Sequence, residues 1–263
     1  MKISIITAVL NSKNTLIEAI KSLSDQTYLD IEHIIIDGGS TDGRVDLIRE
    51  YEKSHGSERE IKWLSEPDRG MYDALNKGIG LATGEVIGLL HSDDFYAHDS
   101  VLTKVAEAFE KDGVDSCYGD LVYVDSTNTN RTIRFWRSGS FNERSFYWGW
   151  MPPHPTFFVK REIYNKYGGF NLELGSAADY ELMLRFLLRY GISTAYIPEV
   201  LVKMRVGGAS NASLRNRIHA NLMDRRAWRV NGLKPYPWTL WFNPLRKIPQ
   251  FLFLNQAPNY STS

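Results

Sequence analysis

The stretch Val86-Ile87-Gly88-Leu89-Leu90-His91-Ser92-Asp93-Asp94 joins an apolar run to two adjacent carboxylates. An apolar run without polar alternation is typical of a strand that is buried on both faces, as in a parallel sheet covered by helices. In open α/β sheets, ligands bind in the crevice beyond the carboxyl ends of such strands. Adjacent carboxylates repel each other unless a cation or hydrogen-bond donors neutralise them, and their hard oxygens suit Mg²⁺ or Mn²⁺. The stretch therefore predicts a buried strand that ends at a metal site, although Ser and Asp are also typical of a helix N-cap or a turn.

The residues before this stretch show the same pattern three more times. Strand-like apolar runs at residues 3–7, 31–36 and 61–64 each end in a polar loop, and each is followed by a segment of helical periodicity. Such alternation indicates a parallel sheet with right-handed crossovers. We therefore expect an α/β fold with a mostly parallel central sheet flanked by helices, in which the first four strands present their loops along one edge.

Beyond residue 110 the regular alternation breaks down. Further strands are expected at residues 116–124, 132–136, 156–159, 194–197 and 200–204, and helices at residues 160–166, 177–189 and 214–229. The remaining residues, 233–263, form a tail that is rich in aromatic and basic side chains. The tail is predicted to be a helical and aromatic appendage to the domain.

Composition limits the function classes. The chain has 263 residues with a formal net charge of zero, so it can bury a large core but has no general field for binding nucleic acid. The single cysteine, Cys117, excludes an intramolecular disulfide framework and fits a reducing compartment. The first residues lack the pattern of a signal peptide, and no apolar run reaches the roughly 18–20 residues of a membrane span. We expect a cytoplasmic protein, either soluble or attached to the inner face of the membrane.

A second acidic loop follows the strand at residues 31–36. Asp37 heads this loop, which also contains Gly38, Gly39 and Gly43. Glycines let a ligand approach the backbone closely, but their spacing here matches neither a dinucleotide fingerprint nor a Walker sequence. Two interpretations stay open: a tight strand-to-helix turn, or a loop in which Asp37 accepts hydrogen bonds from a nucleobase or a ribose.

Two further segments place basic and amide groups at the same expected edge. Asp68-Arg69-Gly70 begins a loop, and Asn76-Lys77 lies in the helix that follows. A guanidinium and an ammonium near metal-binding carboxylates suit a diphosphate. The alternative is ordinary surface charge at the start of a helix.

Taken in order, these segments resemble the family-two inverting glycosyltransferases, which have the GT-A fold, a nucleotide-binding α/β sandwich. The resemblance is carried by Ser4-Ile5-Ile6-Thr7 with Asn11, Asp37-Gly38-Gly39-Ser40-Thr41-Asp42-Gly43, Glu66-Pro67-Asp68-Arg69-Gly70, Asp73-Ala74-Leu75-Asn76-Lys77-Gly78, Ala82-Thr83-Gly84 and Ser92-Asp93-Asp94. It continues more loosely through His154-Pro155-Thr156-Phe157-Phe158, Gly168-Gly169-Phe170, Asp179 and Arg205-Val206-Gly207-Gly208-Ala209-Ser210. Bacterial exopolysaccharide and lipopolysaccharide transferases, including those of the colanic-acid type, look most similar.

The resemblance implies a role for each matching position. Asp179 matches the catalytic base, and it carries that role alone because Ala178 stands where family members often have Glu. Asp94 matches the direct ligand of Mn²⁺ or Mg²⁺, and Asp93 matches the residue that faces the ribose or the metal. The implied donor-binding residues are Thr7, Ala8, Asn11, Asp37, Asp68, Arg69, Asn76, Lys77, Asp93 and Arg205.

Three of these expectations have an alternative from the residues alone. Arg205 precedes a Gly-Gly pair and is either part of a lid over the donor or the end of a strand at a turn. His154 and Trp150 are assigned to acceptor binding, and a structural role is the alternative for both.

The function that follows is a metal-dependent inverting transfer of a sugar from a UDP- or GDP-sugar donor to a saccharide or lipid-linked acceptor in surface polysaccharide biosynthesis. Residues 1–110 are expected to bind the nucleotide sugar, and residues 111–232 to carry the acceptor site and the base. Arg225-Arg226-Ala227-Trp228 does not match the Gln-x-x-Arg-Trp of processive synthases. The alternatives are a sugar nucleotidyltransferase, although residues 8–14 lack the glycines of its phosphate loop, and a non-catalytic nucleotide- or sugar-binding module.

The tail at residues 233–263 has two interpretations. Trp and Tyr favour bilayer interfaces, and Arg and Lys favour anionic headgroups, so the tail is predicted to contact the membrane peripherally. Alternatively, it packs on the domain or forms a contact in a homo-oligomer.

Overall fold

The computed structural model describes residues 1–56, 59–207, 214–239 and 249–252. Its centre is a nine-stranded sheet in the order β3-β2-β1-β4-β8-β6-β9-β5, with β7 paired to β6. The strands are β1 Ile3–Val9, β2 Ile31–Asp37, β3 Glu60–Ser65, β4 Val86–Leu89, β5 Asp94–Tyr96, β6 Ser116–Val124, β7 Thr132–Trp136, β8 Phe158–Lys160 and β9 Thr194–Arg205.

The first four strands confirm the predicted parallel arrangement. β1 pairs in parallel with β2 and with β4, and β2 pairs in parallel with β3. The crossovers are α1 Lys13–Ser24, α2 Arg44–His55 and α3 Met71–Leu81. Because these strands run in one direction, their carboxyl ends and the following loops share one edge. The remaining strands form antiparallel pairs between β4 and β8, β5 and β9, β6 and β7, and β6 and β8. A parallel pair joins β6 and β9, so the sheet as a whole is mixed.

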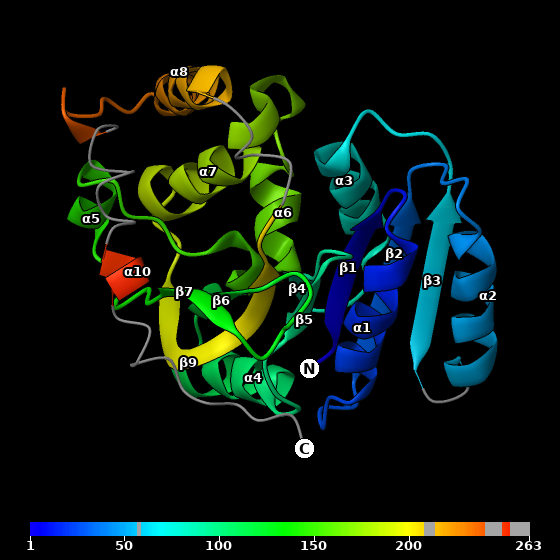
Figure 1. Cartoon of the computed structure of the whole chain (residues 1–263). Helices are drawn as coiled ribbons and strands as arrows, with labels where there is room; N and C mark the ends of the chain where they lie inside the picture. The colour runs from blue at the N-terminus through cyan, green and yellow to red at the C-terminus, as the bar shows by residue number, and fades with distance from the viewer. Residues whose placement is uncertain (57–58, 208–213, 240–248, 253–263) are drawn as a thin grey trace.

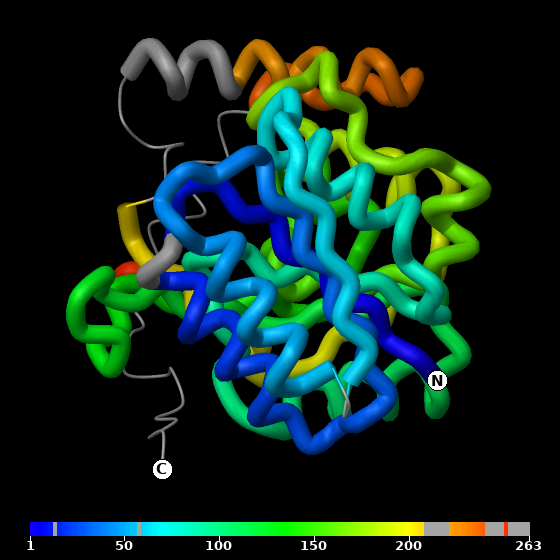
Figure 2. Tube along the Cα trace, turned by 90° about the vertical axis from the view of Figure 1, so that its right-hand side faces the viewer, coloured from blue at the N-terminus to red at the C-terminus, as the bar shows by residue number. Residues whose placement is uncertain are grey.

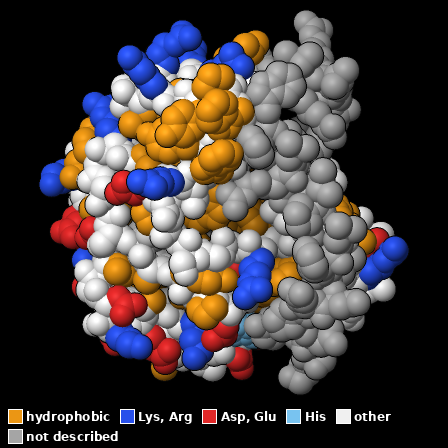
Figure 3. Space-filling model, turned by 90° about the vertical axis from the view of Figure 1, so that its left-hand side faces the viewer, with side chains coloured by type: hydrophobic (Ala, Val, Ile, Leu, Met, Phe, Trp, Pro, Cys, Tyr) orange, Lys and Arg blue, Asp and Glu red, His pale blue; other side chains and the backbone are white. Residues whose placement is uncertain are grey.

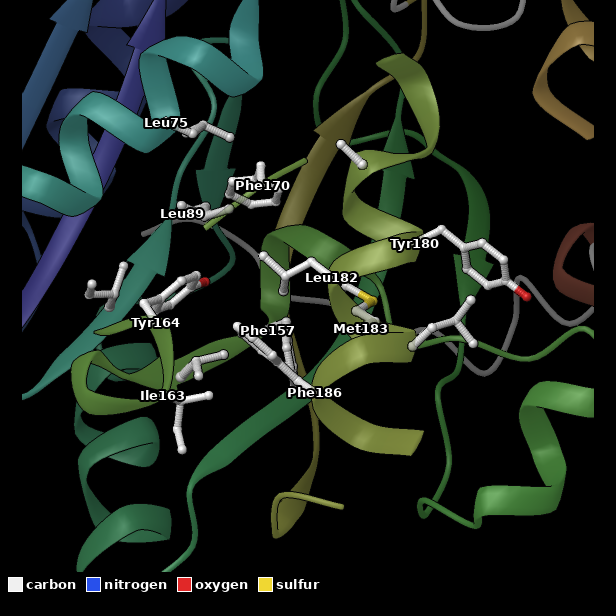
Figure 4. Packing of buried hydrophobic residues seen from close by; sticks show 14 of the residues in the cluster. Leu75, Leu89, Phe157, Ile163, Tyr164, Phe170, Tyr180, Leu182, Met183 and Phe186 are labelled. Carbon is white, nitrogen blue, oxygen red and sulfur yellow. The ribbon is translucent and has the colours of Figure 1, made fainter. Parts of the chain in front are cut away.

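Helices cover both faces of the sheet (Figure 1). Successive strand residues point to opposite faces, so Ile34 and Ile36 enter one core cluster and Ile35 enters another. One face packs on α1, α2 and α4 (Val101–Asp112), and Figure 2 shows α1 and α2 lying side by side in blue. The other face packs on α3, α6 (Arg161–Tyr167) and α7 (Ala178–Met183), whose aromatic and aliphatic side chains interlock in Figure 4.

Several elements differ from the sequence prediction. β5 and α4 were not predicted. The strand expected at residues 156–159 is a 3₁₀ turn, His154–Thr156, followed by β8, because Pro153 and Pro155 favour a turn. One continuous strand, β9, replaces the two strands expected at residues 194–197 and 200–204, and its register against β6 shifts near its middle. The expected helix at residues 177–189 is α7 followed by a π-helical segment, Leu184–Arg189. The helix expected at residues 214–229 is confirmed as α8, Leu214–Val230.

The described parts of the tail pack on the domain. The ring of Tyr236 lies 5.0 Å from that of Tyr147 in α5 (Glu143–Tyr147), and the Thr239 hydroxyl donates to the Tyr147 carbonyl oxygen at 2.7 Å. Gln250, in α10 (Pro249–Leu252), accepts a 2.6 Å hydrogen bond from Arg134 Nε on β7. The predictions for residues 240–248 and 253–263 lie outside the described residues. In the described part of the chain, no helix has the length and apolarity to cross a membrane.

Candidate active site

Four loops meet at the carboxyl edge of β1, β2, β3 and β4. The Asn11 amide N–H donates to Ser40 Oγ at 3.1 Å, and the Asn11 side chain accepts from the Thr41 N–H at 3.3 Å. Ser12 Oγ and Ser92 Oγ lie 2.8 Å apart, which joins the first loop to the loop that carries Asp93. These contacts bring together the sequence segments that were predicted to bind the donor.

Asp37 lies at the end of β2 with its carboxylate fully buried. Oδ2 accepts hydrogen bonds from the N–H groups of Gly39 and Ser40, at 3.3 and 3.1 Å, and from the Ser65 hydroxyl at 2.7 Å. Oδ1 is also buried, and the described residues give it no hydrogen-bond partner. An unpartnered buried acceptor is costly, so this oxygen is poised to accept a hydrogen bond from a ligand.

The neighbouring loop carries Asp68 and the predicted cation Arg69, and the second predicted cation, Lys77, lies in the α3 helix that follows. Asp68 packs directly against Gly38, where a Cβ atom would come within 2.4 Å of Asp68 Oδ2. The exposed Arg69 pairs with Asp73 at 3.0 Å, and Lys77 pairs with Glu66 at 2.7 Å. Both cations therefore lie at this edge in exchangeable surface ion pairs, which contribute little stability.

Four predicted site residues make contacts within the fold. Asn76 binds the Phe170 backbone in both directions, accepting from its N–H at 2.7 Å and donating to its carbonyl oxygen at 2.9 Å. Thr7 Oγ1 lies 3.0 Å from His33 Nε2 on the face covered by α1 and α2, whereas Ala8 packs on the opposite face. Trp150 is buried, with its indole N–H donating to the Ser138 carbonyl oxygen at 2.8 Å. The structure places Asn76, the Thr7 side chain and Trp150 in structural contacts.

Asp94 begins β5 and is fully buried. Neither carboxylate oxygen finds a hydrogen-bond partner among the described residues. Burial raises the pKa of Asp94 well above its ordinary value, and the adjacent Asp93 raises it further, whereas Arg205 opposes the rise. Asp93 is only partly buried and lies beside it in the loop.

This donor set fits a divalent cation. Two orphaned oxygens on a buried carboxylate are the groups that a cation would satisfy, and Asp93 can add another oxygen. Within the described ranges, no point gathers three or more His, Cys, Asp or Glu side chains suited to a metal. Mg²⁺ and its relatives are commonly held by one or two carboxylates plus the phosphates of a substrate, so a two-carboxylate site is sufficient.

Arg205 ends β9 and is buried beside this loop. Its guanidinium donates to the Asp93 carbonyl oxygen at 2.6 Å, forms an ion pair with Glu18 and lies 4.9 Å from the centroid of the Phe95 ring. Arg205 thus holds the Asp93 loop in place. The glycine that follows Gly207, at position 208, lies outside the described residues.

Asp179 stands at the start of α7 on the other side of the site. Oδ1 accepts a 2.8 Å hydrogen bond from the Tyr180 N–H, and Oδ2 lies 3.2 Å from Nδ1 of His154. The Tyr72 hydroxyl also lowers the pKa of this carboxylate. Burial raises the pKa of Asp179 against the lowering effect of these donors, so the carboxylate is a stronger base than an exposed Asp.

The two acidic groups belong to one site. His91 and His154 face each other with their Nε2 atoms 3.0 Å apart, which connects the loop of Asp93 to Asp179. Burial raises the pKa of Tyr123, Arg134 opposes the rise, and the charges of both Asp94 and Asp179 add to it. His91, Tyr72 and Tyr123 were not predicted as site residues, and the only sequence signal for His91 is its place just before Ser92 and Asp93.

The sequence matches the model of the family described as glycosyl transferase family 2 over residues 4–168. The chain belongs to this family. An uncharacterized glycosyltransferase of Mycobacterium tuberculosis is 35% identical over 193 residues, which cover 71% of this chain and 69% of the relative. The glycosyltransferase assignment predicted from the motifs is therefore confirmed, whereas the colanic-acid-type detail stays a prediction.

Two solved structures share the fold. The S. aureus TarS 1-349 complex with UDP-GlcNAc superposes with a TM-score of 0.64 at 18% identity, covering 85% of this chain and 65% of that one. The mannosyltransferase PcManGT from Pyrobaculum calidifontis, in complex with GDP-Man and Mn²⁺, also gives a TM-score of 0.64 at 18% identity, covering 96% of this chain and 70% of that one. The GT-A-like α/β architecture predicted from the sequence is confirmed.

Proposed function

We propose that this glycosyltransferase performs a metal-dependent inverting transfer of a sugar from a UDP- or GDP-sugar to a saccharide or lipid-linked acceptor in surface polysaccharide biosynthesis. The observation that carries the proposal is the pairing, in one site, of an orphaned buried carboxylate at Asp94 with a separate basic carboxylate at Asp179. The UDP-GlcNAc bound to TarS, and the GDP-Man and Mn²⁺ bound to PcManGT, support a nucleotide-sugar donor and a divalent cation.

The chemistry is a single displacement. Asp179 accepts the proton of the acceptor hydroxyl as that oxygen bonds to the anomeric carbon, and the bond from this carbon to the diphosphate breaks with its electron pair leaving on the phosphate oxygen. A divalent cation held by Asp94 and Asp93 supplies Lewis-acid stabilisation of that charge when bound. Arg69 and Lys77 exchange their present ion pairs for the diphosphate, and the free Oδ1 of Asp37 accepts from the nucleoside.

Donor binding and transfer can be tested separately. A thermal-shift panel of UDP-glucose, UDP-galactose, UDP-N-acetylglucosamine and GDP-mannose, each with Mn²⁺ or Mg²⁺, should identify the donor because a bound ligand raises the apparent stability. Asp179→Asn should retain that shift and lose transfer by about 100-fold or more, as expected for a general base. Glu173→Gln, which alters an exposed carboxylate on the preceding turn, should retain both. Full transfer activity in Asp179→Asn would refute the proposed base.

A membrane-facing role is the second part of the proposal. Trp148, Tyr236 and Trp238 form an aromatic surface in which the side chains are 46%, 47% and 43% exposed. The rings of Tyr236 and Trp238 stack with centroids 5.2 Å apart, and Figure 3 shows hydrophobic side chains gathered on this side of the molecule next to Lys and Arg. Exposed basic residues nearby in sequence are Arg225, Arg229 and Lys234. This combination suits an anionic lipid surface that presents a lipid-linked acceptor.

Vesicle flotation tests this contact. The protein should float with phosphatidylglycerol-containing vesicles but not with pure phosphatidylcholine, and a Trp148→Ala/Trp238→Ala double variant should lose most of that binding. Tyr190→Ala removes an aromatic ring that is 39% exposed elsewhere and is the matched control. Equal flotation of the double variant and the control would exclude the aromatic surface as the contact.

A further inference from the structure

A chain of close polar contacts leads from the loop of Asp93 to the proposed base. His91 Nε2 lies 3.0 Å from His154 Nε2, and His154 Nδ1 lies 3.2 Å from Asp179 Oδ2. Both nitrogens of His154 are therefore committed, one to a carboxylate and one to a second imidazole. His154 has no nitrogen left for an acceptor sugar, so acceptor contact does not explain its position.

The protonation of this chain follows from its surroundings. Burial lowers the pKa of His154 to about 4, so this ring is neutral near pH 7 and carries one N–H. A neutral ring can donate from only one nitrogen. With Asp179 ionised, His154 must donate from Nδ1 to the carboxylate and accept at Nε2, so His91 must donate from Nε2. One tautomer of His154, together with an N–H on His91 Nε2, satisfies both contacts.

The backbone around His154 is restrained as well. His154 lies between Pro153 and Pro155 in a 3₁₀ turn, and a proline on each side removes backbone freedom. The Tyr180 N–H holds Oδ1 of Asp179 while His154 lies against Oδ2, so the plane of the carboxylate is fixed from both ends. Asp179 and His154 retain 14% and 22% side-chain exposure, which leaves the carboxylate reachable from the site.

We propose that His154 is a positioning residue that orients the Asp179 carboxylate through Nδ1, and that His91 fixes the required tautomer of His154 through Nε2. This inference depends on the proposed role of Asp179 as the base. Because His91 and Asp93 are two positions apart, these contacts join the proposed base and the loop of the proposed metal carboxylates into one rigid assembly.

Asn and Gln substitutions test the chain because each amide reproduces a different imidazole nitrogen. An Asn amide nitrogen occupies the place of Nδ1, and a Gln amide nitrogen reaches the place of Nε2. His154→Asn should therefore keep kcat within about threefold, whereas His154→Gln should lower it by about 10- to 100-fold with a smaller change in KM, as expected when a reacting group is misoriented. At His91 the order should reverse, with Gln tolerated and Asn damaging.

The activity readout is release of nucleoside diphosphate from the sugar nucleotide that gives the largest thermal shift, and thermal unfolding of each variant is measured in parallel. The reversed preference at the two positions supports the inference. Equal losses for Asn and Gln at both positions, or losses that follow the melting temperature, would overturn it, because a purely structural role has no reason to distinguish the nitrogens.

Two further measurements separate this inference from the proposed base. In protein labelled with ¹⁵N-histidine, the ring nitrogen shifts should show His154 protonated at Nδ1 and His91 protonated at Nε2, and the opposite tautomers would refute the chain without any donor. His154→Gln should cause no further loss in an Asp179→Asn background. If Asp179→Asn abolishes transfer while His154→Gln does not affect it, the base stands and the positioning role fails. If Asp179→Asn is fully active, the proposed base itself is wrong.

Discussion

Asp94→Asn should make the metal-free protein more stable while removing its response to metal. Asp94 is fully buried, and both oxygens lack a hydrogen-bond partner within the described structure. A buried carboxylate costs several kcal/mol, because the protein interior replaces little of the hydration that it loses, and the nearby Arg205 offsets only part of that cost. The amide of Asn fills the same space without a charge and leaves polar groups unpaired at a cost of about 1–3 kcal/mol. The difference predicts a gain of about 1–3 kcal/mol in the free energy of unfolding when no metal is present.

Urea denaturation in EDTA, and then with Mn²⁺ and UDP, measures both halves of this prediction. Wild-type protein should gain about 2.7 kcal/mol when the free ligands reach 100 times their dissociation constant, whereas Asp94→Asn should gain little. Glu32→Gln is the matched control, because Glu32 is equally buried but accepts from the Thr83 N–H and hydroxyl at 2.9 and 2.8 Å and pairs with Lys62. The same carboxyl-to-amide change there should destabilise the protein in both conditions.

Two results would refute this reasoning. If Asp94→Asn is less stable than wild type in EDTA, the Asp94 carboxylate makes a stabilising interaction in the folded protein that the amide loses. If the variant keeps the full stabilisation by Mn²⁺ and UDP, Asp94 is not the metal ligand.

Three other predictions address the donor pocket, pH and the base. Gly38→Ala should weaken UDP binding about 10-fold with little change in stability, because its Cβ would come within 2.4 Å of Asp68 Oδ2. Gly80→Ala, whose Cβ would meet no atom within 4 Å apart from its chain neighbours and the backbone of its own helix, should bind UDP normally in the same calorimetric titration. Burial lowers the pKa of His33 to about 3, so the unfolded chain, but not the folded protein, takes up a proton at His33 below about pH 6.5, and the folded protein loses stability as the pH decreases. Between pH 7 and pH 5.5, the free energy of unfolding of wild type relative to His33→Gln should drop by about 1.3 kcal/mol in urea denaturation. A difference that stays constant with pH would contradict this prediction. Because burial raises the pKa of Asp179, kcat/KM should fall on acidification with a midpoint above 3.8, and a rate that is independent of pH down to that value would count against Asp179 as the base.

Local sequence pattern predicted the first half of the fold and the acidic positions of the site. The strand before Asp93 is an uninterrupted apolar run, and the strand that ends at Asp37 is apolar except for Glu32 and His33. A parallel sheet brings their carboxyl ends to one edge. The glycines and polar residues after these strands marked the loops correctly, because turn chemistry is a local property.

Local sequence pattern could not predict which distant segments contact each other. His91 and His154 are 63 positions apart, and neither residue carries a sign of the other in its neighbours. β5 has only three residues, too few for a period to show. The indole of Trp150 is suited both to stacking on a sugar and to packing in a core. Only the structure shows that Tyr118 and Phe146 pack around it.

The pairing of β5 with β9 sets the order in which the site can be completed during synthesis. The four parallel strands can form from the first 89 residues, but β5 lies at the end of the sheet path and pairs with β9, and Arg205 anchors the Asp93 backbone across 112 positions. While the ribosome is still extending the chain, Asp93 and Asp94 therefore have no paired strand beside them until Asp179 has also emerged. A growing or prematurely ended chain can fold much of its parallel half without completing the proposed active site.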